Sequence, residues 1–518
     1  MMKRVLSLAL SVLMVLSLLA GCGGQQDSTD DAAPSETGET RDDLVIALAT
    51  EPTQLDPHYL SDTNSSLVVL NTHDPLFRRL PSGEIEPALA EDYELSEDGT
   101  SITLYIRQGV KFQDGTELTA EDVAFSLNRA TATAQSEAYT ESFKEAVVVD
   151  DYTVRLDLLY PDVAVLPLLT QGNNCIVPKH VVEEVGETEY AGNICGTGPY
   201  KLVEWQKGAK LVLEANEDYW QGAPAIKRLE YRILAETTTA IVALETGSVD
   251  LVMNIGALDA QLVQENPDLA YAETTSTTTY YVGFNCAKAP LDNKLVRKAL
   301  AMAVDKDAVI LGAVDGAGVV AANVMPDGTT GAPAEADQPT IPYDPEAAVK
   351  LLEEAGYGPG ELTVHLAVRE GATKKAGTIL QDQWKAIGVN TVVDTLERSA
   401  MLNDMYNGNL EAYIVGDVAL TMDASMQTST LDSSTIPYTN STFYSNPEYD
   451  ALNDEQAVQM NDPERRVEII TQMMEIEVED APRVHLYHPV SNIAYNKNLN
   501  VEVSPTVEGY FTYGMSWN

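Results

Sequence analysis

Residues that commonly build metal sites and nucleophilic centres are scarce in this chain. It has only four cysteines and six histidines in 518 residues. They form no CxxC pair and no Cys/His cluster, so the sequence indicates no metal site, and we expect no cofactor. The motifs GxSxG and HExxH and the P-loop pattern are also missing, which leaves no nucleophile–base set to name. An enzyme is therefore the least favoured class of protein.

One histidine pair has metal-like spacing. His485 and His488 are three residues apart in "VHLYHP". This stretch has the pattern of a strand, in which positions i and i+3 point to opposite faces of the sheet. Packing or surface histidines are therefore expected here rather than metal ligands.

Positive charge is scarce as well. Lys and Arg total 32 against 79 Asp and Glu, which gives a formal net charge of −47. A chain this acidic repels phosphate backbones, so nucleic acid is not an expected partner. The charge could steer cationic ligands, but solvation of an exposed protein is the simpler interpretation.

Long apolar runs are limited to the N-terminus. Lys3 and Arg4 precede an apolar run over residues 5–20. This run is shorter than the roughly 20 residues of a membrane-spanning helix. No stop-transfer charges follow it, so residues 1–21 are predicted to be a cleaved export signal. No later stretch approaches the length of a membrane span, and we expect no other one.

The signal ends at Leu19-Ala20-Gly21-Cys22, which resembles the lipobox of bacterial lipoproteins. In that motif the cysteine receives the lipid; an ordinary signal peptide that happens to carry a cysteine is the alternative. Residues 23–42 are mostly Gly, Ser, Thr, Asp, Glu and Pro, a composition typical of a flexible tether. Residues 22–42 are thus predicted to anchor an extracytoplasmic body to the bacterial cell membrane through lipid alone.

Three cysteines follow the tether. Cys175 and Cys195 could bridge in an oxidising compartment, but spacing alone does not decide whether they do. Cys286 would then be left over.

Strand-like and helical runs alternate throughout residues 43–518, a length that calls for two or three domains. Residues 200–220 predict a β-hairpin. Thr119, with an acid three residues on, predicts a capped helix start. Residues 293–310 predict one helix with an apolar stripe, and 361–396 predict a β-α-β unit of an α/β domain.

Four stretches together resemble one family. They are "THDPLFRRLPSGEIEPALAEDYELSEDGT" and its continuation to residue 129, "GTGPYKLVEWQKGAK" from 196, "YYVGFNCAKAPLDNKLVRKAL" from 280 and "YDPEAAVKLLEEAGY" from 343. Their order and spacing resemble those of the extracellular solute-binding proteins of the peptide/nickel class, family 5, which are the capture subunits of ABC importers.

The resemblance implies an α/β fold of the type II (cluster C) periplasmic-binding-protein kind. Two α/β lobes are joined by a hinge, and an extra domain is inserted in lobe I. Lobe I is expected at 43–76, 195–273 and 487–518, the inserted domain at 77–194, and lobe II at 274–486. Ligand is bound between the lobes as they close, and the closed form is what a permease recognises. A monomer is expected.

The resemblance also implies where a peptide amine would be held. Peptide-binding members carry a Gly-Trp-x-x-Asp word in lobe II, whose carboxylate pairs with the free amine. Here Gly416 matches the glycine, Asp417 occupies the tryptophan position and Leu420 the aspartate position. Either Asp417 or Asp423 takes over the amine, or the ligand has no such amine.

Five further residues are candidate ligand contacts. Arg369 follows a strand and has a fork suited to a carboxylate; a surface charge is the alternative. Glu51 and Thr53 follow the first strand, where a cleft is expected to open. Tyr281 and Asn285 open lobe II, with strand packing as the alternative.

The sequence therefore predicts a lipid-anchored, extracytoplasmic substrate-binding subunit of an ABC importer that captures a peptide or other small polar solute. Two alternatives stay open. The same fold can serve a surface receptor or sensor without import. The ligand can also be a metal chelate, because a chelator would bring its own metal-binding groups.

Overall fold

The computed structural model describes residues 41–460, 462–506 and 509–518. The export signal, Cys22 and almost all of the tether lie outside the described residues. The chain from Arg41 to Asn518 is one compact unit. No helix in the described part combines the length and the apolar character of a transmembrane span.

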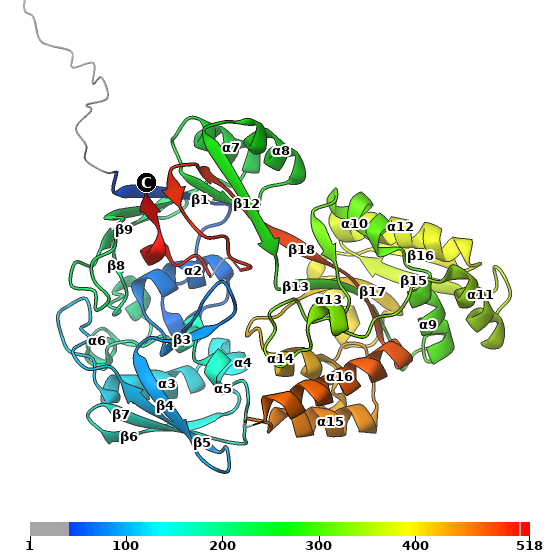
Figure 1. The fold of residues 1–518 in the computed structure, drawn as a ribbon, viewed down its shortest axis with the longest axis horizontal. Coiled ribbons are helices and arrows are strands. Elements are labelled where there is room, and N and C mark those ends of the chain that lie inside the picture. The colour runs from blue at the N-terminus through cyan, green and yellow to red at the C-terminus, as the bar shows by residue number, and fades with distance from the viewer. Residues whose placement is uncertain (1–40, 461, 507–508) are drawn as a thin grey trace, which may run out of the picture. The chain divides into compact units, whose positions relative to one another are not determined.

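Twelve strands of the described chain form one large mixed sheet. Its main path runs β16-β15-β17-β13-β18-β11-β1-β10-β9-β8, and β12 and β14 each pair with β18 (Figure 1). We call the part with β1 and β8–β12 the lobe I half, and the part with β13–β17 the lobe II half. The lobe I strands are β1 (Asp43–Leu48), β8 (Tyr200–Gln206), β9 (Lys210–Ala215), β10 (Arg228–Ile233), β11 (Leu251–Met253) and β12 (Leu269–Thr275). The lobe II strands are β13 (Thr278–Phe284), β14 (Gly318–Val320), β15 (Thr363–Val368), β16 (Asn390–Thr395) and β17 (Ala412–Val418).

One long strand, β18 (Arg483–Asn496), belongs to both halves. Its first residues pair antiparallel with β13, and its last residues lie between β11 and β12. The chain also passes between the halves from β12 to β13. Two adjacent passages between two α/β halves confirm the predicted two-lobe fold, and the passages form its hinge (Figure 1). The expected lobe boundary at residue 487 falls inside β18.

The lobe I half is built around β1, which pairs in parallel with β10 and β11. A strand flanked on both sides carries apolar residues on both faces: Leu44, Ile46 and Leu48 are buried on one face of β1, and Ala47 is buried on the other. The predicted hairpin is confirmed, because β8 and β9 pair antiparallel across Gly208, which takes a φ of +74°. Helices α2 (Thr63–Thr72), α7 (Thr237–Glu245) and α8 (Ala257–Glu265) also belong to this part of the chain.

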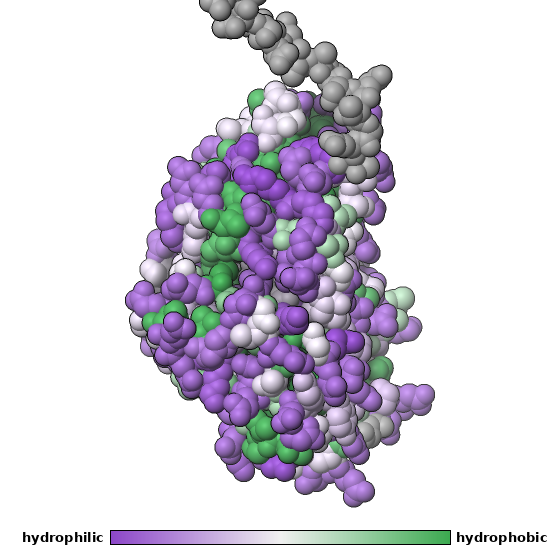
Figure 2. Space-filling model, turned by 90° about the vertical axis from the view of Figure 1, so that its left-hand side faces the viewer, coloured by the Kyte–Doolittle hydropathy of each residue, from purple (hydrophilic) through white to green (hydrophobic). Residues whose placement is uncertain are grey.

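A separate antiparallel sheet has the order β4-β5-β7-β6. Its strands are β4 (Ala90–Leu95), β5 (Ser101–Ile106), β6 (Phe143–Asp150) and β7 (Thr153–Leu158), preceded by the short pair β2 (Phe77–Arg79) and β3 (Ile85–Pro87). Helix α3 (Ala120–Thr131) packs against β6 and begins with the predicted capping box of Thr119 and Asp122, which is confirmed. The short helices α4 (Glu137–Thr140), α5 (Val165–Leu168) and α6 (Lys179–Val185) complete this unit. The face of the molecule on this side is mostly hydrophilic, with separate small apolar areas (Figure 2).

In the lobe II half, β15 and β16 are parallel and joined by α12 (Ala372–Ala386), which confirms the predicted β-α-β unit. The single helix predicted over residues 293–310 is wrong. The chain forms α9 (Lys294–Met302) and α10 (Lys306–Val314), because the carboxylate of Asp305 accepts a hydrogen bond from the Ala308 amide and starts a new helix. The other helices are α11 (Pro345–Glu354), α13 (Arg398–Tyr406), α14 (Ala424–Thr428), α15 (Pro447–Ala457) and α16 (Pro463–Asp480). A last two-stranded sheet pairs β19 (Leu499–Asn500) with β20 (Ser516–Trp517).

The bridge considered between Cys175 and Cys195 is not formed, and both are free thiols. They belong to different apolar clusters: Cys175 packs with Leu60 and Val69, and Cys195 belongs to the core of the antiparallel sheet unit. Burial raises the pKa of Cys195 to about 11, which keeps it a neutral thiol at physiological pH.

Candidate functional site: a cavity at the hinge

A cavity of about 710 Å³ lies where the two halves meet at the hinge. Both hinge passages line it, Thr274–Thr278 from β12–β13 and Pro489–Ser491 from β18. Arg78 and Arg79 line it from β2, and Leu420 lines it from the segment after β17. Its volume is within the range of pockets that enclose small organic ligands.

The lining combines apolar side chains with many uncharged polar groups and contains few acids. All five residues of Thr274–Thr278 carry hydroxyl groups, and Gln171, Asn173 and Asn254 add amides. The charged side chains among the described lining residues are two arginines and one carboxylate, Asp327, which is exposed. The chain has a net charge of −47, yet the described residues that line this cavity carry an excess of positive charge.

The two arginines differ in their partners. Arg78 Nη2 donates to Asp74 Oδ1 at 2.9 Å, and Asp74 is fully buried. The Arg78 guanidinium also lies 3.9 Å from the centre of the Phe511 ring. The charge of Arg78 is therefore compensated inside the protein.

Arg79 has only carbonyl partners. Its Nη1 donates to the Gly83 carbonyl at 2.9 Å and its Nη2 donates to the Thr421 carbonyl, while its buried Nε has no partner. Burial lowers the pKa of Arg79 to about 10, because water no longer stabilises the charge fully. No ion pair of Arg79 is found in the described chain. Among the described residues Arg79 has no ion-pair partner, and Asp423, the one carboxylate whose charge raises its pKa, is itself paired with Arg466.

Direct contacts bridge the cavity between the antiparallel sheet unit and the lobe II half. The Arg79–Thr421 hydrogen bond is one, and Gln171 Nε2 donates to the Leu420 carbonyl at 3.4 Å. Farther out, the Val163 amide donates to the Ala457 carbonyl at 3.2 Å. These bonds link parts of the chain that hinge motion would separate.

The model of the bacterial extracellular solute-binding proteins, family 5, matches residues 84–438. The chain belongs to this family. Its members are the substrate-binding proteins of ABC importers, are extracytoplasmic and are not enzymes.

Relatives and solved structures agree with this membership. The glutathione-binding protein GsiB of Salmonella typhimurium is 30% identical over 470 residues, covering 88% of this chain and 91% of the relative. Heme-binding protein A of Haemophilus influenzae is 29% identical, with 98% and 96% covered. The solved structure of HbpA2 from Haemophilus parasuis has a TM-score of 0.84 at 27% identity and covers 92% of this chain and 99% of that one. The peptide complex of DppA from Helicobacter pylori has a TM-score of 0.75 at 25% identity, with 92% and 98% covered.

The segment that the resemblance aligned with the amine-binding word of peptide binders does reach the cavity in this solute-binding protein. Leu420 is among the lining residues, and it places an apolar side chain there. The seven residues proposed from the sequence as ligand contacts are not among the lining residues.

Asp423 is engaged elsewhere. It is 1% exposed, caps α14, and holds Arg466 through both carboxylate oxygens, with Arg466 Nη1 at 2.9 Å from Oδ2. This bidentate pair leaves Asp423 no free oxygen that faces a ligand.

Asp417 lies near the cavity but faces the interior of the lobe II half. It is on β17 opposite Thr279, and its neighbour Val418 lines the cavity. Its Oδ2 is buried without a partner. Burial raises the pKa of Asp417, and the charge of Arg483 partly offsets this effect.

Glu51 and Thr53 stabilise local structure. Glu51 accepts hydrogen bonds from the Trp205 indole at 2.8 Å and from the Gly208 amide at 2.9 Å, so it holds the β8–β9 hairpin. The Thr53 hydroxyl donates to Asp62, the residue that caps α2.

The remaining three candidates also lie away from the cavity. Tyr281 is 7% exposed and packs in an apolar cluster with Tyr413. Asn285 donates to the Gly408 carbonyl at 3.1 Å and thereby fixes the end of β13. Arg369 is exposed after β15.

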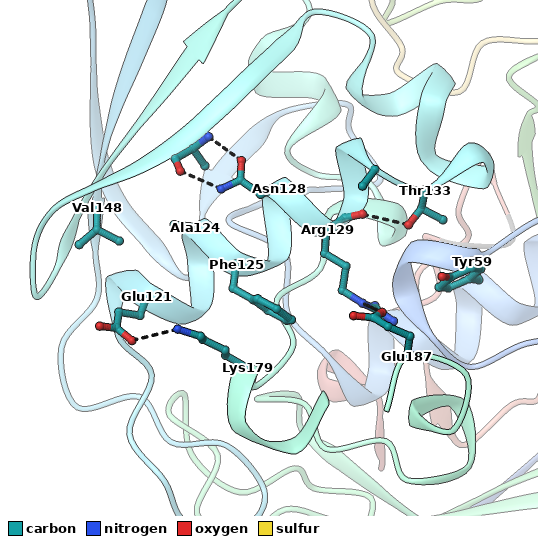
Figure 3. A pocket seen from close by; sticks show the side chains of 12 residues that line it. Tyr59, Glu121, Ala124, Phe125, Asn128, Arg129, Thr133, Val148, Lys179 and Glu187 are labelled. Atoms are coloured by element: carbon teal, nitrogen blue, oxygen red, sulfur yellow. Dashed lines mark hydrogen bonds and ion pairs between the residues drawn. The ribbon is translucent and has the colours of Figure 1, made fainter. Parts of the chain in front are cut away.

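A second cavity, of about 700 Å³, lies on the antiparallel sheet unit between α3 and α6 (Figure 3). Phe125 and Arg129 project into it from α3, on the side of Lys179 and Glu187. Its charged groups are paired with one another or with Asp56. It offers an incoming solute no uncompensated charge.

The described residues hold no group of three or more His, Cys, Asp or Glu side chains that could bind a metal ion. His485 and His488 are both buried; His485 Nε2 lies 3.3 Å from Glu477, and Thr279 lies beside His488. Neither lines the hinge cavity.

Sequence reasoning missed Arg79. Its neighbours "FRRLPSG" were part of a stretch used to identify the fold, and nothing local separates Arg79 from Arg78. The only signal was a second arginine beside a Ser82-Gly83 turn. In the fold, Asp74 pairs with Arg78, whereas Arg79 meets only backbone carbonyls, including that of the distant Thr421, and neither contact can be read from the local sequence.

Proposed function

We propose that this protein is the lipid-anchored substrate-binding subunit of an ABC importer and captures a peptide or other small polar solute in the hinge cavity. The observation that carries this proposal is the lining itself. One cavity gathers both hinge passages, the β2 arginines and the segment after β17. A solute held there touches every part that moves when the lobes close.

The anchor and the domain limits are part of the proposal. A signal over residues 1–21 and a lipid on Cys22 would tether the body through residues 22–42. Lobe I would comprise 43–76, 195–273 and 487–518, the inserted domain 77–194, and lobe II 274–486. The antiparallel sheet unit supports a separate inserted domain, because its strands pair only among themselves.

We propose that the lobes close because some contacts form only in the closed form. In the open form, Arg79 and Gln171 would lose their bonds to the carbonyls of Thr421 and Leu420. A solute that bonds to both sides adds affinity only in the closed form, so it shifts the population toward that form. The permease would then read the closed form.

Similar proteins support a ligand with polar groups. Their names specify glutathione and heme, and one solved structure holds a peptide. In this chain Leu420 removes the carboxylate that would pair with a peptide amine. A solute that does not depend on such an amine therefore suits this cavity better.

Native mass spectrometry of the full-length protein in detergent tests the proposal. We expect a small-molecule adduct that is lost on denaturation. Leu420→Trp fills part of the hinge cavity and should abolish the adduct, whereas Val148→Trp, in the second cavity, should retain it. Retention by Leu420→Trp together with loss in Val148→Trp would place the site on the antiparallel sheet unit instead.

The anchor is tested separately by cell fractionation. Wild-type protein should be found in the membrane fraction, and Cys22→Ser should be found in the soluble fraction. Membrane association of Cys22→Ser equal to wild type would contradict a lipid anchor on that residue.

A further inference from the structure

We infer that Arg79 selects the ligand by its negative charge: the solute carries a carboxylate or a phosphate that serves as the counter-ion of Arg79, and it needs no free amine. This inference rests on the proposed function and names the chemical class of its solute.

Arg79 has hydrogen-bond partners but no charged partner among the described residues. Its guanidinium donates to two backbone carbonyls, those of Gly83 and Thr421, and its Nε has no partner. Carbonyl dipoles satisfy hydrogen bonds but do not neutralise a charge. A partly buried charge without a counter-ion is unfavourable, so an anion that reaches the Arg79 guanidinium gains the energy of an ion pair.

The neighbouring cations are already paired with carboxylates. Arg78 pairs with Asp74 at 2.9 Å, and Arg466 pairs with Asp423 at 2.9 Å. Of these three arginines, Arg79 is therefore the one with which an anionic ligand can form an ion pair.

The cavity offers few carboxylates to a cationic ligand. Among the described residues that line the cavity, Asp327 is the only carboxylate, and it is exposed to solvent. Leu420 takes the place of the amine-binding aspartate. An ammonium group entering this cavity would lose water without gaining a buried partner, which disfavours it.

The hydroxyl groups of Thr274–Thr278 suit the rest of such a solute. They can donate to carbonyl or hydroxyl oxygens and adapt their orientation. The expected solute is thus an organic acid or phosphate with further oxygen groups.

The test uses the solute fraction that denaturation releases from wild-type protein. One portion is methyl-esterified to remove carboxylates, one is treated with alkaline phosphatase, and one is acetylated to remove amines. Rebinding to fresh full-length protein, depleted of solute, is measured by calorimetry. Acetylation should leave affinity within about twofold, whereas esterification or phosphatase treatment should lower it by about 10- to 100-fold. Which treatment acts distinguishes a carboxylate from a phosphate.

Variants connect the charge preference to Arg79. Arg79→Gln should bind the untreated solute about 10- to 100-fold more weakly and should no longer distinguish it from the neutralised solute. Arg79→Lys should keep the preference at lower affinity, and Arg369→Gln, an exposed arginine outside the lining, should match wild type. A merely structural role of Arg79 would change affinity without changing this discrimination.

Two failures are distinguishable. If wild-type protein releases no solute and rebinds none, both the proposed function and this inference fail. If it releases a solute whose affinity falls only on acetylation, or if Arg79→Gln discriminates as wild type does, solute capture stands and the inference is overturned.

Discussion

Neutralising Asp423 should destabilise the protein rather than alter its ligand. Asp423 and Arg466 have side chains 1% and 5% exposed, and two hydrogen bonds join them. Removing one partner of a buried ion pair leaves the other charge unpaired, which typically costs about 3–5 kcal/mol. Asp423→Asn keeps a capping oxygen for α14 and removes only the charge.

The expected shift in melting temperature follows from the unfolding entropy. With about 2.1 cal/mol/K per residue and a cooperative unit of roughly 200–480 residues, a loss of about 3 kcal/mol lowers Tm by about 3–7 °C. Differential scanning calorimetry of Asp423→Asn measures it. Asp423→Ala should lose about 1 kcal/mol more, because it also removes the cap.

A double mutant gives the control. Asp423→Asn combined with Arg466→Met removes both charges and should recover part of the lost stability. The reasoning is refuted if Asp423→Asn melts within 1 °C of wild type while its affinity for the released solute falls at least tenfold, since Asp423 would then be a ligand contact.

Three other perturbations test further parts of the structure. Burial, and second the charge of Arg129, lower the pKa of His58 to about 3, so on acidification the unfolded chain takes up a proton at His58 before the folded chain does. The free energy of unfolding should therefore be unaffected by His58 above pH 6.5 and about 2 kcal/mol lower at pH 5. Urea titrations at pH 7 and pH 5 measure this difference, which His58→Asn should reduce. A Cβ on Gly198 would lie 2.4 Å from the backbone at the end of α2, so Gly198→Ala should lower the free energy of unfolding by about 3 kcal/mol or more. The control is Gly192→Ala, where nothing lies within 4 Å of the added Cβ, and it should cost under about 0.5 kcal/mol. Equal midpoints of the two variants in urea would contradict this packing. Leu420→Asp should weaken binding of the released anionic solute about tenfold or more, because the new carboxylate repels a ligand of like charge. An unchanged affinity in calorimetry would show that residue 420 does not lie beside the bound solute.

The sequence predicts local structure well where chemistry is local. The Thr119 capping box, the hairpin around Gly208 and the β-α-β unit at 361–396 each depend on residues within one short segment. The sequence did not predict the break between α9 and α10, because an aspartate such as Asp305 is compatible both with an exposed position inside a helix and with the cap of a new helix.

The site was harder to predict than the fold. Asp417 and Asp423 were identified by their distance from Gly416, but which face a strand residue presents, and whether a carboxylate already has a partner, depends on segments far away in the chain. Arg466, which neutralises Asp423, lies 43 residues farther along the chain. The uncompensated charge of Arg79 likewise becomes visible only once Thr421 is placed beside it.

A crystal structure of the protein with the released solute bound tests ligand capture at the hinge most directly. We expect electron density for the solute in the hinge cavity, with an anionic group within hydrogen-bond distance of Arg79 and the remainder against Thr274–Thr278. Density in the cavity beside Phe125 and Arg129, with the hinge cavity filled only by water, would contradict it.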